Sequence, residues 1–80
     1  MKEDIIEFLE SDEYLFKFDP LPTKYIDDIL TDLNFNVSIG EDLIDNNNFY
    51  YIYVKDNIRL CIAGDFYSGV TSINKQKWIT

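Results

Sequence analysis

The sequence predicts an α+β fold in which two N-terminal helices pack on a three- to four-stranded antiparallel meander. The first observation is that apolar residues recur with helical spacing up to residue 34. The second is that from residue 35 they alternate with a period of two, which is typical of half-buried strands. The third is size, because 80 residues with 46% hydrophobic content form one domain, residues 1–80.

The first predicted helix covers residues 3–16. Ile5, Ile6 and Leu9 follow helical spacing and would form its apolar face. Acidic residues in its first turn favour the positive end of the helix dipole. The segment "FDPLPT", residues 18–23, then ends the helix, because each proline restricts the residue before it to extended conformations.

The second predicted helix covers residues 23–34. One apolar face is formed by the side chains at i, i+3, i+4 and i+7, which are Ile26, Ile29, Leu30 and Leu33. Thr23 is the expected N-cap. Asn34 is the expected left-handed residue that ends the helix, since asparagine tolerates positive φ.

The strands are predicted from the alternation that follows. Their expected ranges are 35–39, 49–55, 58–63 and 66–73, and the tail from residue 74 fits either a strand or a short helix. A loop is expected over residues 40–48. Tight turns are expected at Asp56–Asn57 and Gly64–Asp65, with Gly69 as a bulge or bend.

The strand within "DNNNFYYIYV", residues 45–54, has two apolar faces. Alternate side chains point to opposite sides of a sheet, so neither face of this strand is polar. We expect the helices to cover one face. The other face has no obvious cover in so short a chain and is a candidate interaction surface.

Charge is distributed unevenly along the chain, which has a net charge of −8. Residues 1–45 hold 13 acids and 3 bases, a charge of −10, whereas residues 46–80 hold 2 acids and 4 bases, a charge of +2. The acidic part should repel nucleic acids and membrane surfaces and attract basic proteins. We therefore expect neither direct nucleic-acid binding nor membrane association.

Residues for catalysis and metal binding are scarce. The chain has no histidine and one cysteine, Cys61, so it lacks the commonest general base and the ligands of a zinc site. Its three glycines are isolated and form no phosphate-binding loop. We expect no enzyme activity, cofactor or metal. A single cysteine and an acidic start also favour a cytoplasmic location.

Candidate binding residues come from the acidic helices and the aromatic strand. Like charges four positions apart destabilise a helix, so their repetition requires another explanation, either partner binding or solubility. Tyrosine is common at interface hot spots. The candidate partner-binding residues are Glu7, Glu10, Asp28, Asp32, Glu41, Asp42, Tyr51 and Tyr53.

Three classes of function compete. We expect a small acidic inhibitor of the immunity or anti-defence type, which neutralises a basic partner such as a nuclease toxin by direct binding. The alternative is a subunit or homo-oligomeric structural or interaction module without catalytic activity, for example a homodimer, in which an open sheet face or edge strand pairs with another copy. A small enzyme or ligand-binding domain would need a substantial pocket.

Overall fold

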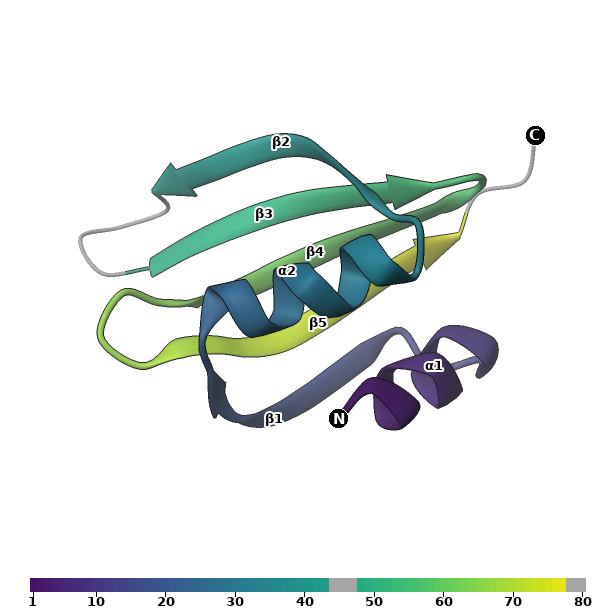
Figure 1. Cartoon of the computed structure of the whole chain (residues 1–80), viewed down its shortest axis with the longest axis horizontal. Helices are drawn as coiled ribbons and strands as arrows, with labels where there is room; N and C mark the ends of the chain where they lie inside the picture. Colours follow the sequence, from purple (N-terminus) through teal and green to yellow (C-terminus); the bar gives the residue numbers. More distant parts are fainter. Residues whose placement is uncertain (44–47, 78–80) are drawn as a thin grey trace.

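The computed structural model describes residues 1–43 and 48–77, and the side chains of residues 1–38 and 48–77. Two helices and five strands follow in the order α1 (Lys2–Glu10), β1 (Leu15–Leu21), α2 (Thr23–Asp32), β2 (Asn36–Leu43), β3 (Asn48–Lys55), β4 (Ile58–Asp65) and β5 (Gly69–Lys77). All strand pairs are antiparallel, in the spatial order β1-β5-β4-β3-β2 (Figure 1). The predicted α+β class with an antiparallel sheet is confirmed, but the sheet has five strands rather than three or four.

The prediction that both helices are N-terminal to the sheet is wrong, because β1 separates them. Helix α1 ends at Glu10, and Ser11 is already extended with φ −85° and ψ 173°. Strand β1 then pairs with β5, with Phe16 opposite Ile73, and forms one edge of the sheet. Pro20 is tolerated in β1 because a proline, which has no N–H to donate, fits an edge strand.

Helix α2 matches its prediction over most of its length. Ile26, Ile29 and Leu30 are buried, as the helical spacing predicts. Asn34 has φ 71° and is the left-handed residue at the C-terminal end, so that prediction is confirmed. The predicted N-cap is wrong, because Pro22 occupies that position and Thr23 is already helical.

The hairpins differ in how well the sequence predicts them. The turn at Asp56–Asn57 is confirmed, and Asp56 has φ 53°. The turn predicted at Gly64–Asp65 is wrong, because β4 continues to Asp65 and the turn covers residues 66–68. The Asp65 carboxylate stabilises this turn, because its Oδ1 accepts hydrogen bonds from the backbone N–H groups of Tyr67 and Ser68, with N···O distances of 2.7 and 2.9 Å.

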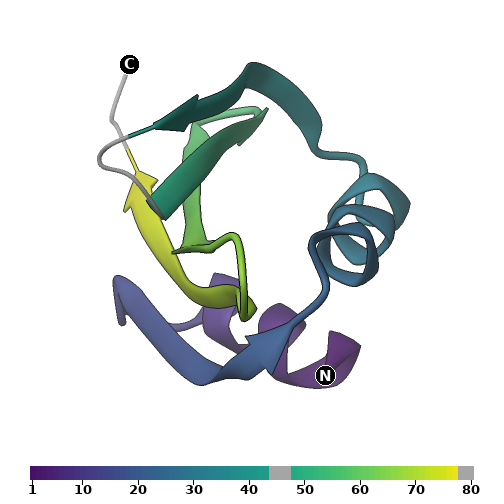
Figure 2. The ribbon, with the colours of Figure 1, turned by 90° about the vertical axis from the view of Figure 1, so that its left-hand side faces the viewer.

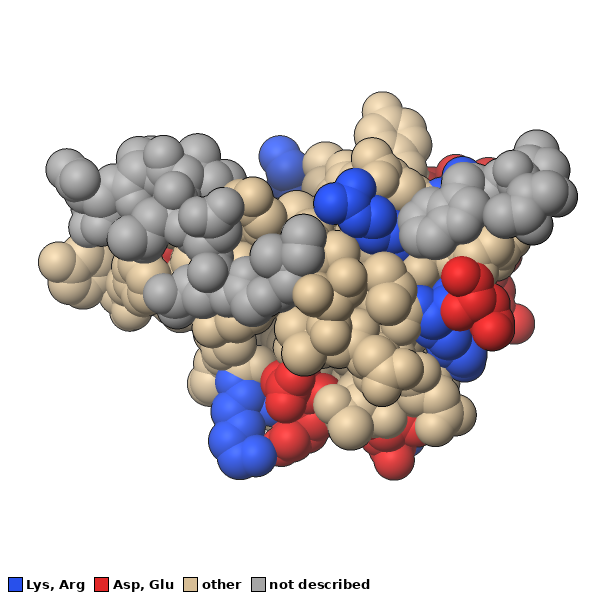
Figure 3. Space-filling view, turned by 90° about the horizontal axis from the view of Figure 1, so that it is seen from above, with Lys and Arg blue, Asp and Glu red and all other residues tan. Residues whose placement is uncertain are grey.

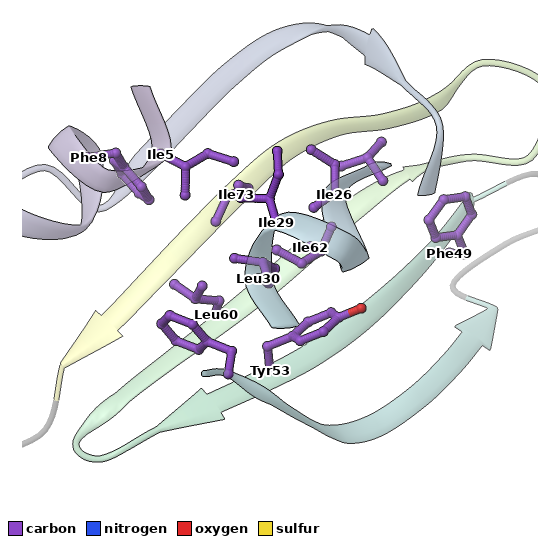
Figure 4. Close-up of a cluster of buried hydrophobic side chains, with 12 residues drawn as sticks. Ile5, Phe8, Ile26, Ile29, Leu30, Phe49, Tyr53, Leu60, Ile62 and Ile73 are labelled. Atoms are coloured by element: carbon purple, nitrogen blue, oxygen red, sulfur yellow. The ribbon is translucent and has the colours of Figure 1, made fainter. Parts of the chain in front are cut away.

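The sheet is strongly curved, and α2 lies in its concavity (Figure 2). The buried hydrophobic cluster lies between α2, α1 and the inner sheet face (Figure 4) and includes Ile5, Phe8, Ile26, Leu30, Leu60, Ile62 and Ile73. Helix α1 lies beside β1, and its Phe8 ring packs on Phe16 with centroids 5.6 Å apart. Burial of α1's apolar stripe leaves its other side exposed.

The two apolar faces of β3 are both largely withdrawn from solvent. On the inner face, Phe49 and Tyr53 are buried in the core cluster. On the outer face, Ile52 is 3% exposed, and Tyr50 and Val54 are half-buried. Tyr50 and Ile52 nevertheless line a hollow of about 330 Å³ on the outer side of the sheet, so a smaller surface than the sequence suggests stays accessible there.

Candidate functional site

Helix α1 and the turn after it place six carboxylates at the surface. All six side chains are exposed, namely Glu3, Asp4, Glu7, Glu10, Asp12 and Glu13. Glu3, Glu7 and Glu10 fall at i, i+4 and i+7, so they follow one line along the helix, which we call the acidic ridge. Ile5 and Phe8 are buried on the other side of α1, which fixes the outward direction of the ridge.

The positive charges of Lys2 and the amino terminus do not pair with the ridge. Within residues 1–43 and 48–77, no salt bridge involves Glu3, Glu7 or Glu10. The Lys2 ammonium instead contacts the Asp32 carboxylate at the end of α2. The amino terminus lies 3.7 Å from the Asp4 carboxylate.

Lys75 provides a third positive charge near α1, but it is directed inward. Its side chain is 5% exposed, and Nζ donates hydrogen bonds to the carbonyl oxygens of Phe8 and Ser11, each at 2.6 Å. Burial lowers the Lys75 pKa, Lys77 adds to this effect, and Asp12 and Glu13 oppose it. The Lys75 ammonium therefore binds carbonyl oxygens beneath α1 and does not contact the carboxylates of the ridge.

Two hollows flank the ridge. The first, the acidic groove, has a volume of about 260 Å³ and is lined by Asp4, Glu7, Phe8, Ser11, Glu13 and Phe16. The second, the apolar groove, has a volume of about 250 Å³ and is lined by Ile6, Leu9, Glu10, Leu33, Phe35, Lys55 and Ile58. Successive residues of α1 point in different directions, so a single helix contributes to both grooves.

The predicted acids of α2 differ from those of α1 because lysines accompany them. Asp28 is exposed and lies 3.1 Å from the Lys24 ammonium one turn earlier, and Asp32 contacts Lys2. Seen from above the view of Figure 1, a basic side chain lies near the middle of this face among uncharged residues, and carboxylates lie toward its lower and right-hand edges (Figure 3). Glu41 and Asp42 belong to β2, but their side chains lie outside the described residues.

The predicted tyrosines lie on the inner face of β3. Tyr53 is 4% exposed, and its hydroxyl donates a hydrogen bond to the Asp27 carboxylate at 2.5 Å. Tyr51 is half-buried and packs on Phe49 with centroids 5.6 Å apart. Tyr53 therefore cannot contact a partner without a rearrangement of the core.

Among the side chains that the structure describes, the most exposed aromatic ones lie elsewhere. Tyr67 is 86% exposed and Phe66 is 47% exposed, both in the turn between β4 and β5. Tyr14, after α1, is 70% exposed. The alternation of apolar residues gave no indication of these positions, because exposure in a turn depends on where the strands end.

Sequence reasoning also missed two other parts of this region. The sequence places Asp12 and Glu13 in a longer first helix, but both follow the end of α1, and Glu13 lines the acidic groove. The spacing places Ile6 on the apolar face of the helix, but in the structure it lines the apolar groove. The positions of Asp12 and Glu13 would be predicted correctly if the sequence showed that α1 ends at Glu10. The position of that helix end depends on the packing of β1, which the local sequence does not show.

The described residues include one cysteine and several carboxylates, the side chains from which a metal site would be built. No group of three or more Cys, Asp and Glu side chains among them is placed to hold a metal ion. Cys61 is half-buried in β4, where burial raises the pKa of its thiol, and nearby Arg59 opposes this effect. No helix in the described ranges has the length and apolar character needed to cross a membrane.

Comparisons of the chain with protein-family models, curated proteins and solved structures gave no match.

Proposed function

We propose that this chain is a small acidic binding protein that neutralises a basic protein partner, such as a nuclease toxin, by direct contact in the cytoplasm. The observation that supports the proposal is the acidic ridge, whose three carboxylates are exposed and lack salt bridges to other described residues. Such an inhibitor of the immunity or anti-defence type needs no catalytic group, cofactor or metal.

The cost of the ridge to the isolated protein supports a role in binding. Like charges at i, i+4 destabilise a helix by roughly 0.2–0.5 kcal/mol per pair, and Glu10 lies at the negative end of the α1 dipole. No basic residue of α1 itself occupies its last turn, and the Lys75 ammonium beneath the helix binds its last carbonyl groups without forming a salt bridge to the ridge. A basic partner would remove this repulsion on binding, so the charges that destabilise the free helix would stabilise the complex.

The acidic groove beside the ridge suits a lysine or arginine side chain of the partner. Its rim carries the carboxylates of Asp4, Glu7 and Glu13, and the rings of Phe8 and Phe16 lie between them. Carboxylates bind a guanidinium or ammonium by charge-assisted hydrogen bonds, and aromatic rings attract cations. Glu7 borders this groove and also belongs to the ridge, so it is the residue to test first.

The experiment measures association with purified basic nucleases by biolayer interferometry at about 20 and 300 mM salt, a range over which screening becomes strong. The Glu7→Lys variant should lower the association rate by about tenfold at low salt and change the dissociation rate less. The matched control is Asp19→Lys, which makes the same change in net charge at an exposed carboxylate of β1.

Two results would contradict the proposal. One is that no basic nuclease binds at low salt. The other is that Glu7→Lys and Asp19→Lys change the association rate equally, because then only the net charge matters and the ridge is a solubility feature.

A structural or homo-oligomeric role is the second candidate, and the turn between β4 and β5 favours it. Phe66 and Tyr67 expose large aromatic surfaces there, of the kind that interfaces cover. If the chain self-associates through this turn, sedimentation should show an oligomer at high protein concentration that Tyr67→Ser converts to a monomer. A monomer at every concentration would eliminate this candidate.

A further inference from the structure

We infer that the apolar groove receives an apolar side chain from the same basic partner, so that the recognised segment is a basic amphipathic helix. The inference rests on the proposed function and adds the chemistry of the partner's contact segment. It depends on the position of the groove beside the acidic ridge and on the nature of its lining.

The groove is a partly exposed, mainly apolar surface where α1, the end of α2 and the β3–β4 hairpin meet. Ile6 and Leu9 of α1 form one wall, and Leu33 after α2 and Ile58 of β4 complete it. These four side chains are half-buried, whereas Phe35 beneath them is 4% exposed. A volume of about 250 Å³ can accept one large aliphatic or aromatic side chain.

The ridge and the groove are neighbours on one helix. Glu10 belongs to both, and Ile6 adjoins Glu7 and lies one turn from Glu3 and Glu10. Residues three or four apart on a helix have Cβ atoms roughly 5–6 Å apart. A partner helix whose lysines or arginines face the ridge would therefore hold an adjacent row of apolar side chains over the groove.

The charges around the apolar groove favour a basic segment over an acidic one. Lys55 is the base on its lining, and its ammonium donates to the Leu33 carbonyl oxygen at 3.0 Å and lies 5.7 Å from the Phe35 ring centroid. That contact holds the positive charge at one wall, whereas Glu3, Glu7 and Glu10 extend along the helix. An acidic segment, or a second copy of this −8 chain, would be repelled by the ridge.

Ile6 allows a test with little risk to folding. Leu9, Leu33 and Ile58 also pack against the hydrophobic core, but Ile6 is not among the described side chains that do so. Ile6→Ser removes the apolar wall, and Ile6→Val keeps most of it. The matched control is Val37→Ser, which removes a 55% exposed apolar side chain of β2 that does not line the groove.

The probes are fluorescent synthetic peptides measured by anisotropy. One is an amphipathic helix of lysine and leucine, the second has the same composition in a scrambled order, and the third is oligolysine of equal length. Ile6→Ser should weaken binding of the amphipathic peptide by about tenfold, the amount expected for losing one buried aliphatic contact. Ile6→Val and Val37→Ser should change it by less than about twofold, and oligolysine binding should not depend on residue 6.

The outcomes separate this inference from the proposed function. If oligolysine binding requires Glu7 but Ile6→Ser leaves the amphipathic peptide unaffected, the inference is wrong and the acidic ridge retains its role. Equal affinities for the amphipathic and scrambled peptides would also overturn the inference. If none of the three basic peptides binds at low salt, the proposed function fails together with the inference.

Discussion

The Lys75 ammonium lies 2.6 Å from the carbonyl oxygen of Phe8, a residue 67 positions earlier in the chain. It also donates to the Ser11 and Leu9 carbonyl oxygens at 2.6 and 3.5 Å and lies 4.7 Å from the Phe8 ring centroid. A buried cation thus supplies donors at the C-terminal end of α1, where carbonyl groups lack partners within the helix. The acidic ridge depends on this contact, because the same helix carries both.

Replacing Lys75 with methionine should loosen α1 more than the rest of the fold. The aliphatic part of the side chain is retained, but the Ser11 carbonyl oxygen loses the Lys75 donor and the Phe8 carbonyl oxygen keeps only its donors from Ser11, which costs about 1–3 kcal/mol. Amide hydrogen exchange should accelerate in residues 2–10 more than in β3 and β4. The control is Lys77→Met, an exposed lysine on the same strand. Equal protection of α1 in both variants would show that Lys75 does not hold the helix.

The pH dependence of stability should carry the signature of Lys75. Burial lowers its pKa in the folded chain below the ordinary value of 10.5, so the unfolded chain binds this proton more strongly. Between the lowered pKa and 10.5, the contribution of Lys75 to stability should therefore rise with pH. The urea midpoint of the wild type relative to Lys75→Met should increase over this window. A decrease in this relative midpoint would mean that the hydrogen bonds from the ammonium to the carbonyl oxygens raise the Lys75 pKa more than burial lowers it.

Tyr53 should produce the opposite trend at alkaline pH. Burial raises its pKa far above the ordinary value of 10.0, and the hydrogen bond to Asp27 and the Asp27 charge add to this effect. The unfolded chain therefore loses this proton first, and the contribution of Tyr53 to stability is complete below pH 10 and declines above it. Tyr53→Phe should lower stability at pH 7 by about 0.5–1.5 kcal/mol.

The comparison that isolates Tyr53 uses the change in urea midpoint between pH 9 and pH 11. The midpoint should fall less in Tyr53→Phe than in the wild type, because the phenylalanine ring has no proton to lose. Tyr67→Phe is the matched control, since Tyr67 is 86% exposed. If the urea midpoints of the two variants change equally between pH 9 and pH 11, the Tyr53–Asp27 contact does not cause the loss of stability at alkaline pH.

Local patterns in the sequence predict α2 and the β3–β4 hairpin well. Helical spacing identifies Ile26, Ile29 and Leu30, and the tolerance of asparagine and aspartate for positive φ identifies Asn34 and Asp56. Each of these features depends on residues within a few positions of one another. The exposure of the acidic ridge follows from spacing in the same way.

Features that depend on distant partners could not be predicted. Strand β1 was assigned partly to a helix because its partner, β5, lies more than 50 positions away in the pair Phe16–Ile73. A lysine in a polar tail gives no local sign that it will be buried, because the acceptors of Lys75 belong to α1. The apolar groove likewise arises only when α1, the end of α2 and β4 meet.

Gly69 should not tolerate a side chain, because both its backbone conformation and its contact with β1 require glycine. Its φ is +105°, and a Cβ atom there would lie 2.4 Å from the Leu21 carbonyl oxygen. Gly69→Ala should destabilise the fold by about 1–3 kcal/mol from backbone strain, and the clash with β1 adds to this cost. Urea unfolding gives the size of the effect, with Ser68→Ala in the exposed turn as control.

Hydrogen exchange gives a second test of Gly69→Ala. Because Gly69 lies against the end of β1, amide exchange should accelerate at the β1–β5 edge before it does so in β3. Uniform loss of protection across the sheet would instead indicate that the hairpin turn, and not the contact with Leu21, requires glycine.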